Sequence, residues 1–142
     1  MKTRKELLSS LLKTAQLGQI RIRSVLDIGM RPTLRKTLES QLQEFSSIET
    51  EAYNIATQRG WEISDLDPAV RFMADRINRI RVTGNNTDSK IAGIMIRDNT
   101  KGLIKSLQDL HQLTGSDDRV QILSQKLLDC ANASIRQMHG FL

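Results

Sequence analysis

The chain has 142 residues, one cysteine, 4% aromatic residues and a formal net charge of +5. Its length fits one domain over residues 1–142, and the lone Cys130 excludes an internal disulfide and fits a reducing compartment. No apolar run approaches the roughly 20 residues that span a membrane, and the N-terminus lacks a secretory pattern, so we expect a cytoplasmic protein without a membrane partner.

The first predicted helix covers residues 4–29. Small or apolar residues recur there with the alternating three- and four-residue spacing of a bundle-facing helix; they are Leu8, Leu11, Ala15, Gly18, Ile22, Val25 and Gly29. Gly18 lowers helix stability by roughly 1 kcal/mol, but it lets a partner helix approach closely.

The second predicted helix covers residues 33–59. Pro32 is placed to open it, and Gly60 to end it, with Trp61 able to fold back onto the last turn. Its apolar face contains Leu34, Leu38, Gln41, Phe45, Ile48, Ala52 and Ile55. Because only Met30 and Arg31 separate the two helices, they must form an antiparallel hairpin.

The charges of these two helices have opposite signs. Residues 1–36 hold nine Lys or Arg and two acids, a net charge of +7, whereas residues 37–67 hold one Arg and seven acids, a net charge of −6. In the hairpin we expect pairing between helices; Arg21 and Arg23 should face Glu39 and Glu44, and Lys13 should face Glu49 and Glu51. Each exposed pair contributes only about 0–1 kcal/mol, so the pairs would select the register rather than stabilise the fold.

A short third helix is predicted over residues 68–83. Asp67 as N-cap and Pro68 as the first helical residue form its start signal. Its apolar positions are Val70, Met73, Ala74, Ile77 and Ile80, and residues 68–81 carry a net charge of +3.

The last two helices are predicted over residues 88–114 and 117–139. Thr87 or Asp88 caps the first of them, and Ser116 caps the second. The stripe of the first contains Ile91, Met95, Leu103, Leu107 and Leu110; that of the second contains Val120, Leu123, Leu127, Cys130, Ser134 and Met138. No segment alternates with the period of a strand, so the expected fold is an all-α, up-down bundle of four long helices with a short extra helix.

Three polar residues, Asp98, Asn99 and Thr100, interrupt the stripe of the helix 88–114. They could form a buried polar layer that binds a small ion or ligand, with Gln41 or Glu51 opposite. They could instead face solvent, with Asp98 paired with Arg97 or Lys101, or Asp98 could be buried and satisfied by a Ser or Arg that fixes the register. An unpaired buried carboxylate would cost several kcal/mol, so we favour the solvated or paired interpretations.

Three segments, "IETEAYNIATQRGW", "MIRDNTKGLIKSLQDL" and "KLLDCANASIRQMHGFL", resemble bacterial ferritin-like proteins related to spore coat protein F. The resemblance covers roughly residues 34–142. It implies a ferritin-like order of two hairpins joined by a crossing segment. It also implies a structural role associated with spores or stress.

Catalytic members of that superfamily use inward Glu residues and two Glu-x-x-His pairs, whose spacing brings carboxylate and imidazole to one metal. Here the residues three positions after Glu39, Glu44, Glu49 and Glu51 are Leu42, Ser47, Ala52 and Asn54. His111 and His139 follow Gln108 and Arg136 at the same spacing, and both fit a helix C-terminus instead. We therefore expect no catalytic residue, metal ligand or cofactor. Cys130 is expected to be a small buried thiol, and Tyr53 and Trp61 to be packing residues.

Four arginines, Arg71, Arg76, Arg79 and Arg81, give the helix 68–83 its charge. They could contact phosphates or an acidic partner, or they could form an ordinary solvated face. No aromatic residues interleave with them and no helix-turn-helix pattern is present, so nucleic-acid binding is the less favoured alternative. The sequence predicts a non-enzymatic bundle that acts as a homo-oligomer or with a protein partner, and it identifies no small-molecule substrate.

Overall fold

The computed structural model describes residues 3–81, 85–112 and 119–142, except for the side chains of residues 75–81. These ranges contain five helices and no strand; the helices are α1 (Arg4–Arg23), α2 (Pro32–Arg59), α3 (Pro68–Arg81), α4 (Thr87–His111) and α5 (Arg119–His139). The predicted all-α class is therefore confirmed for the described part of the chain.

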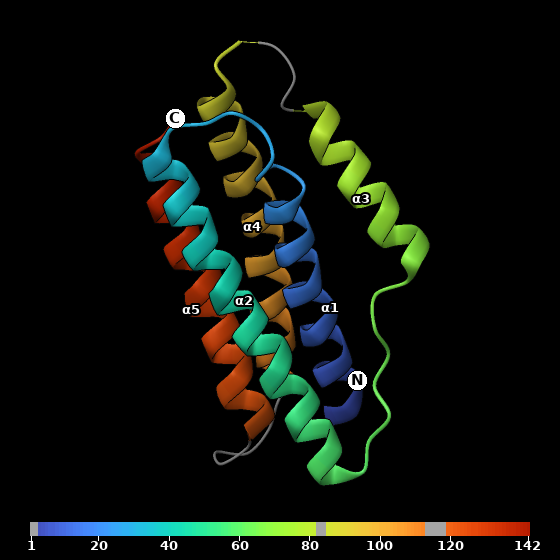
Figure 1. The fold of residues 1–142 in the computed structure, drawn as a ribbon. Helices are drawn as coiled ribbons and strands as arrows, with labels where there is room; N and C mark the ends of the chain where they lie inside the picture. Colours follow the sequence, from blue (N-terminus) through green and yellow to red (C-terminus); the bar gives the residue numbers. More distant parts are fainter. Residues whose placement is uncertain (1–2, 82–84, 113–118) are drawn as a thin grey trace.

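Four of the helices lie side by side around one core (Figure 1). α1 packs against α2 and α4 packs against α5, while contacts of α2 with α5 and of α1 with α4 join the two pairs. The segment 60–67 and α3 run back outside α1, so that α4 begins at the same end of the molecule as α2 (Figure 1). α3 contacts mainly α1 and stands at the edge of the molecule.

The core is aliphatic and follows the predicted stripes of α2 and α5. All seven predicted positions of α2 are buried, and so are all six of α5. α1 adds leucines from two adjacent faces; the buried ones are Leu7, Leu8, Leu11 and Leu12. Phe45 is buried against Gly18 of α1, where a Cβ on Gly18 would lie 3.1 Å from three atoms of the Phe45 ring. The predicted role of Gly18 is thus confirmed.

α1 ends at Arg23, six residues before the predicted end at Gly29. The Ser24 hydroxyl donates to the Arg21 carbonyl at 2.7 Å, and short turns follow. The Arg35 guanidinium donates to the carbonyls of Leu26 and Ile28, the latter at 3.1 Å, which satisfies backbone groups that no helix bond uses. The connection therefore spans residues 24–31 rather than two residues.

The predicted start and stop of α2 and the predicted start of α3 are confirmed, whereas the predicted end of α3 at residue 83 lies outside the described residues. Pro32 is the first residue of α2, and Gly60 ends this helix with φ +66°, where a residue without Cβ is favoured. The Trp61 amide donates to the Ala56 carbonyl at 2.8 Å. At the start of α3, the Asp67 carboxylate accepts from the Ala69 amide at 2.8 Å.

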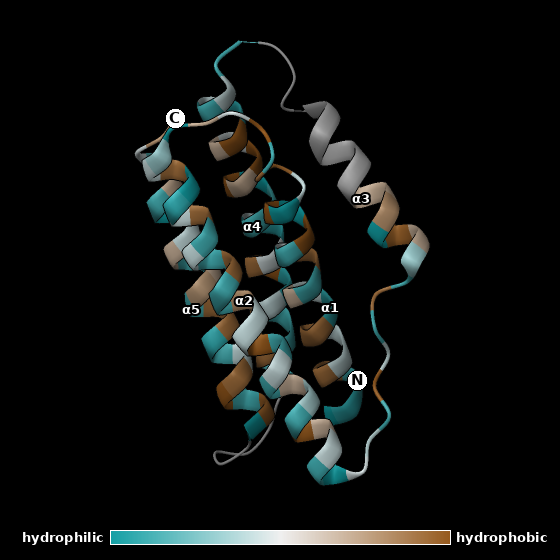
Figure 2. Cartoon of the chain, viewed as in Figure 1, coloured by the Kyte–Doolittle hydropathy of each residue, from teal (hydrophilic) through white to brown (hydrophobic). Residues whose placement is uncertain are grey.

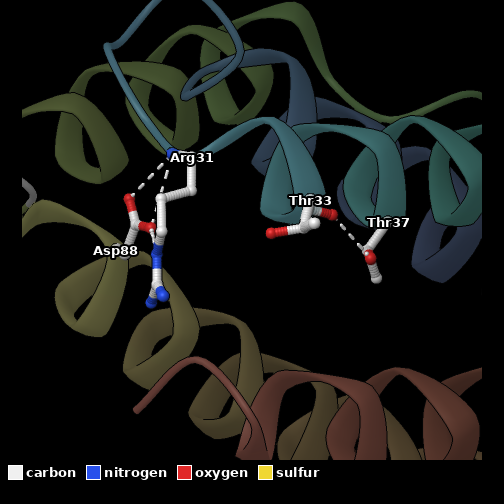
Figure 3. A network of polar contacts seen from close by, with 4 residues as sticks. All are labelled: Arg31, Thr33, Thr37 and Asp88. Atoms are coloured by element: carbon white, nitrogen blue, oxygen red, sulfur yellow. Dashed lines mark hydrogen bonds and ion pairs between the residues drawn. The ribbon is translucent and has the colours of Figure 1, made fainter.

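α4 begins one residue before the predicted start, and its N-cap is Asn86 rather than Thr87 or Asp88. The Asp88 carboxylate instead accepts from the Arg31 backbone amide at 3.4 Å and from Arg31 Nε at 2.6 Å (Figure 3). One turn into α2, the Thr37 hydroxyl donates to the Thr33 carbonyl (Figure 3). Asp88 therefore joins the α1–α2 connection to α4. The predicted cap Ser116 lies outside the described residues, and α5 is described from Arg119.

Candidate functional site

In the C-terminal half of α4, the residues that point into the bundle are polar. The expected stripe continued through Leu103, Leu107 and Leu110, but Leu107 is exposed and the other two are only partly buried. The buried residues there are Asn99, Ser106 and Asp109. This expectation was wrong because Asn99 and Asp109 are hydrogen-bonded to Arg21 and Ser10 of α1, which offsets the free-energy cost of burying them.

The polar residues Asp98 and Asn99, which interrupt the apolar stripe of α4, contact Arg21 of α1. Arg21 Nε lies 3.3 Å from Asp98 Oδ2, and Arg21 Nη1 donates to Asn99 Oδ1 at 3.3 Å. Only 14% of the Arg21 side chain and 13% of the Asp98 side chain are exposed. The third interpretation, an Asp satisfied by an Arg, is the one that the structure bears out, and the predicted pairing with Arg97 or Lys101 is not what the structure describes.

The space next to this pair is small. It has a volume of about 10 Å³ and lies between Arg21, Asn99 and Ser106, with Phe45 and Leu127 closing it. A volume of this size holds one water molecule at most. Farther down the same seam, the Ser10 hydroxyl donates to the buried Asp109 carboxylate at 3.0 Å. The α1–α4 seam is therefore a set of polar helix contacts rather than a ligand cavity.

The three residues proposed for a polar core layer do not form one. Asp98 pairs with α1, whereas the buried Gln41 donates to Gln137 of α5 at 2.8 Å. Glu51 is partly exposed and lies 3.8 Å from Lys126 Nζ, also on α5. Within the described residues, Gln41 Oε1 and Ser134 Oγ are buried without a hydrogen-bond partner. These three candidate residues therefore make separate contacts on different helices.

The expected charge pairing within the α1–α2 hairpin was also wrong. Arg21 pairs with Asp98, Glu51 pairs with Lys126, and the Glu49 carboxylate accepts from Gln19. Lys13 lines a surface hollow next to Lys105 of α4. Of the carboxylates of α2, Glu44 and Glu51 contact α5, whereas Glu49 accepts a hydrogen bond from Gln19 of α1.

Of the four predicted basic residues of α3, the side chain of Arg71 is described; those of Arg76, Arg79 and Arg81 lie outside the described part. Arg71 is partly buried beside a hollow of about 380 Å³ between α1 and α3. This α1–α3 hollow is lined by Ile20, Arg23, Pro68, Arg71 and Phe72. Arg23 of α1 therefore lines the same space as Arg71 of α3.

The apolar residues in the first turns of α3 face away from the core. The exposed fraction is 48% for Val70, 62% for Phe72 and 58% for Met73, and Val70 and Met73 belong to the predicted apolar positions of this helix. Figure 2 shows hydrophobic segments of the ribbon in the first turns of α3, at the edge of the molecule. Sequence reasoning missed this surface because an amphipathic pattern does not say whether the apolar face has a neighbour in the same chain.

A polar network fixes the segment that leads into α3. Gln16 of α1 is buried; it donates to Tyr53 at 3.1 Å and to Asp65 at 3.0 Å, and it accepts from the Leu66 amide at 2.8 Å. The Tyr53 hydroxyl also donates to Asp65. Burial, and then the Asp65 carboxylate, raise the pKa of Tyr53 to about 12. The hydrogen bonds from Tyr53 and Gln16, with the charge of Arg71, lower the pKa of Asp65.

A second hollow, of about 360 Å³, lies between α2 and α5. This α2–α5 hollow is lined by Glu44, Ser47, Ile48, Lys126, Asp129, Cys130 and Ala133. The Cys130 thiol donates to Glu44 Oε2 at 3.3 Å. Burial, and then that carboxylate, raise the pKa of Cys130 to about 12, so the thiol stays protonated at neutral pH. Its expected burial is confirmed.

Both histidines are exposed near helix C-termini, as expected. In the ranges that the structure describes, no group of three or more His, Cys, Asp or Glu side chains could hold a metal ion. Across the same ranges, none of the helices has the length and hydropathy needed to cross a bilayer. Comparison of the chain with family models, with curated proteins and with solved structures found no match.

Proposed function

We propose that this chain is a non-catalytic helical bundle that acts through association with a second copy of itself, and that α3 supplies the contact. The observation that carries the proposal is the apolar surface of α3, formed by Val70, Phe72 and Met73, each about half exposed. Clustered exposed apolar side chains mark interaction sites, and aromatic and Met residues are enriched at the centre of such sites.

A ferritin-like arrangement is part of the proposal. The helix directions support it, because α1 and α2 form one antiparallel pair, α4 and α5 form another, and a long crossing segment with α3 joins them. A spore- or stress-associated role follows from the resemblance alone. In this proposal the buried polar residues, such as Arg21 and Asp98, serve helix packing rather than chemistry.

Binding of nucleic acid or another polyanion by α3 is the second candidate. It is favoured by the four arginines of this helix. The described side chains weigh against it, because Arg71 is partly buried beside α1 whereas the exposed residues next to it are apolar. Phosphate-binding surfaces need their cations accessible.

Size-exclusion chromatography with light scattering tests the proposal. The wild type should exceed the monomer mass of 16.1 kDa, and Val70→Asp/Met73→Asp should return to it. Ile122→Asp is the matched control, since Ile122 is 62% exposed on α5, and it should associate like the wild type. Circular dichroism checks that each variant is folded. A wild type that remains a monomer at high concentration would refute self-association, and a larger species formed only with added DNA would favour the second candidate.

A further inference from the structure

The packing of α3 on α1 leaves the α1–α3 hollow open between the two helices. Pro68, Arg71 and Phe72 have the i, i+3, i+4 spacing of one helix face, and Ile20 and Arg23 lie one turn apart on α1. The hollow between these two faces has a volume of about 380 Å³. Sites for small molecules have volumes of about 300–1,000 Å³, so the hollow is large enough for a small ligand.

The walls of the α1–α3 hollow are apolar, and one of them is accessible. Ile20 on the α1 side is only 6% exposed, whereas Phe72 on the α3 side is 62% exposed. Val70 and Met73, which carry the proposed contact between copies, do not line the hollow. The hollow is therefore a second apolar surface of α3, and a ligand can reach it from solvent.

The charged residues among the described lining of the hollow are both arginines, Arg23 and Arg71. Within the described part of the chain, the Arg23 side chain has no ion pair. The carboxylate next to Arg71 is that of Asp65, which already accepts hydrogen bonds from Tyr53 and Gln16. Those hydrogen bonds, and then the charge of Arg71, lower the pKa of Asp65. One carboxylate held in another network thus serves two guanidinium groups, which leaves positive charge beside an apolar space.

We propose that the α1–α3 hollow binds a fatty carboxylate. Its chain packs against Ile20, Pro68 and Phe72. Its carboxylate lies between Arg23 and Arg71, because guanidinium groups bind carboxylates with paired hydrogen bonds while the stems of the same side chains cover apolar surface. The volume is near the lower end of the range for ligand sites, which favours a single chain over a two-chain lipid. This binding activity goes beyond the self-association proposed above and does not depend on it.

Isothermal titration calorimetry with dodecanoate, kept below the concentration at which it forms micelles, tests the site. The wild type should bind one dodecanoate per chain, and Arg23→Gln and Arg71→Gln should each weaken binding at least about tenfold, since each removes a charged hydrogen-bond donor. Arg97→Gln removes an exposed arginine of α4 outside the hollow and is the matched control. Val70→Ser/Met73→Ser should also bind like the wild type, which separates the hollow from the outer apolar face of α3.

Two further ligands test the chemistry of the site. Dodecyltrimethylammonium has the same chain with the opposite charge, and acetate has the carboxylate without the chain, so neither should bind. Thermal unfolding followed by circular dichroism checks that the variants are folded. Dodecanoate should raise the Tm of the wild type and of Arg97→Gln, but not that of Arg23→Gln/Arg71→Gln.

Binding that is lost in the two hollow variants and kept in both controls supports the site. A wild type that does not bind dodecanoate, an equal loss in Arg97→Gln, or equally tight binding of dodecyltrimethylammonium would overturn it. Each of these results leaves self-association in place, because that proposal is tested by the mass of the protein alone. A monomeric wild type that binds dodecanoate would overturn self-association and support the site.

Discussion

Arg21 Nε lies 3.3 Å from Asp98 Oδ2 across the α1–α4 seam, and neither side chain is more than 14% exposed. The same guanidinium donates to the buried Asn99. A charged pair in this position costs free energy for its desolvation and recovers it only while both partners are present. The pair therefore favours the arrangement in which α4 faces α1 at this level, where both groups have a partner.

Removing one partner of this pair should cost more stability than removing both. Arg21→Met leaves the Asp98 carboxylate without its charged partner and should lower the free energy of unfolding by about 3 kcal/mol. Arg21→Met/Asp98→Leu should lose less than Arg21→Met alone, because the carboxylate is removed together with the guanidinium. Urea unfolding of the four proteins measures the difference. The exposed Arg97→Met should change stability by no more than about 0.5 kcal/mol. Additive losses would show that the two side chains do not interact.

Replacing two helical glycines by alanine should change the free energy of unfolding in opposite directions. A Cβ at Gly18 would lie 3.1 Å from the Phe45 ring, whereas a Cβ at Gly93 meets nothing within 4 Å. Alanine adds about 1 kcal/mol of helix propensity at either position, but overpacking costs about 1–3 kcal/mol. Gly18→Ala should therefore lose about 1 kcal/mol, and Gly93→Ala should gain up to that amount.

Thermal unfolding of the two variants checks these signs. A Phe45→Leu background should abolish the loss caused by Gly18→Ala, because the ring that the new methyl group would meet is gone. If Gly18→Ala stabilises the protein as much as Gly93→Ala, the approach of α1 to α2 is looser than the structure describes.

The spacing of apolar residues was sufficient to predict the buried positions of a helix that packs with one continuous face. Every predicted stripe position of α2 and α5 is buried, and Pro32, Gly60 and Asp67 were correct because turn chemistry is a property of neighbouring residues. The end of α1 was missed because the turn after Arg23 keeps burying apolar residues. Val25 continues the helical stripe although its amide donates to Ile22 in a tighter turn.

The residues that sequence reasoning missed depend on distant partners. Asn99 and Asp109 are buried on α4 because Arg21 and Ser10, 78 and 99 positions away in the chain, bond them. No local pattern distinguishes such a residue from a solvated one. The exposure of the apolar face of α3 was also missed. An amphipathic pattern is the same whether the apolar face packs on the same chain or on a second molecule.

The single tyrosine of the chain should titrate far above its ordinary value. Its pKa is raised to about 12, first by burial and then by Asp65, so the protonated phenol contributes stability below pH 10 that is lost as the pH rises through about 12. For Asp65, whose pKa is lowered, the contribution is present above its ordinary pKa of 3.8 and is lost as the pH falls through the lowered value.

Absorbance of the ionised phenol follows the titration of Tyr53 directly, with circular dichroism recorded on the same samples to show that the helices remain. Asp65→Asn removes the carboxylate but not the burial, so the pKa of Tyr53 should fall yet stay above 10. Asp129→Asn, on the far helix α5, should leave it unchanged. A wild-type midpoint near pH 10 would mean that Tyr53 is not held by Asp65 and Gln16, and that the segment leading into α3 is attached to the bundle in another way.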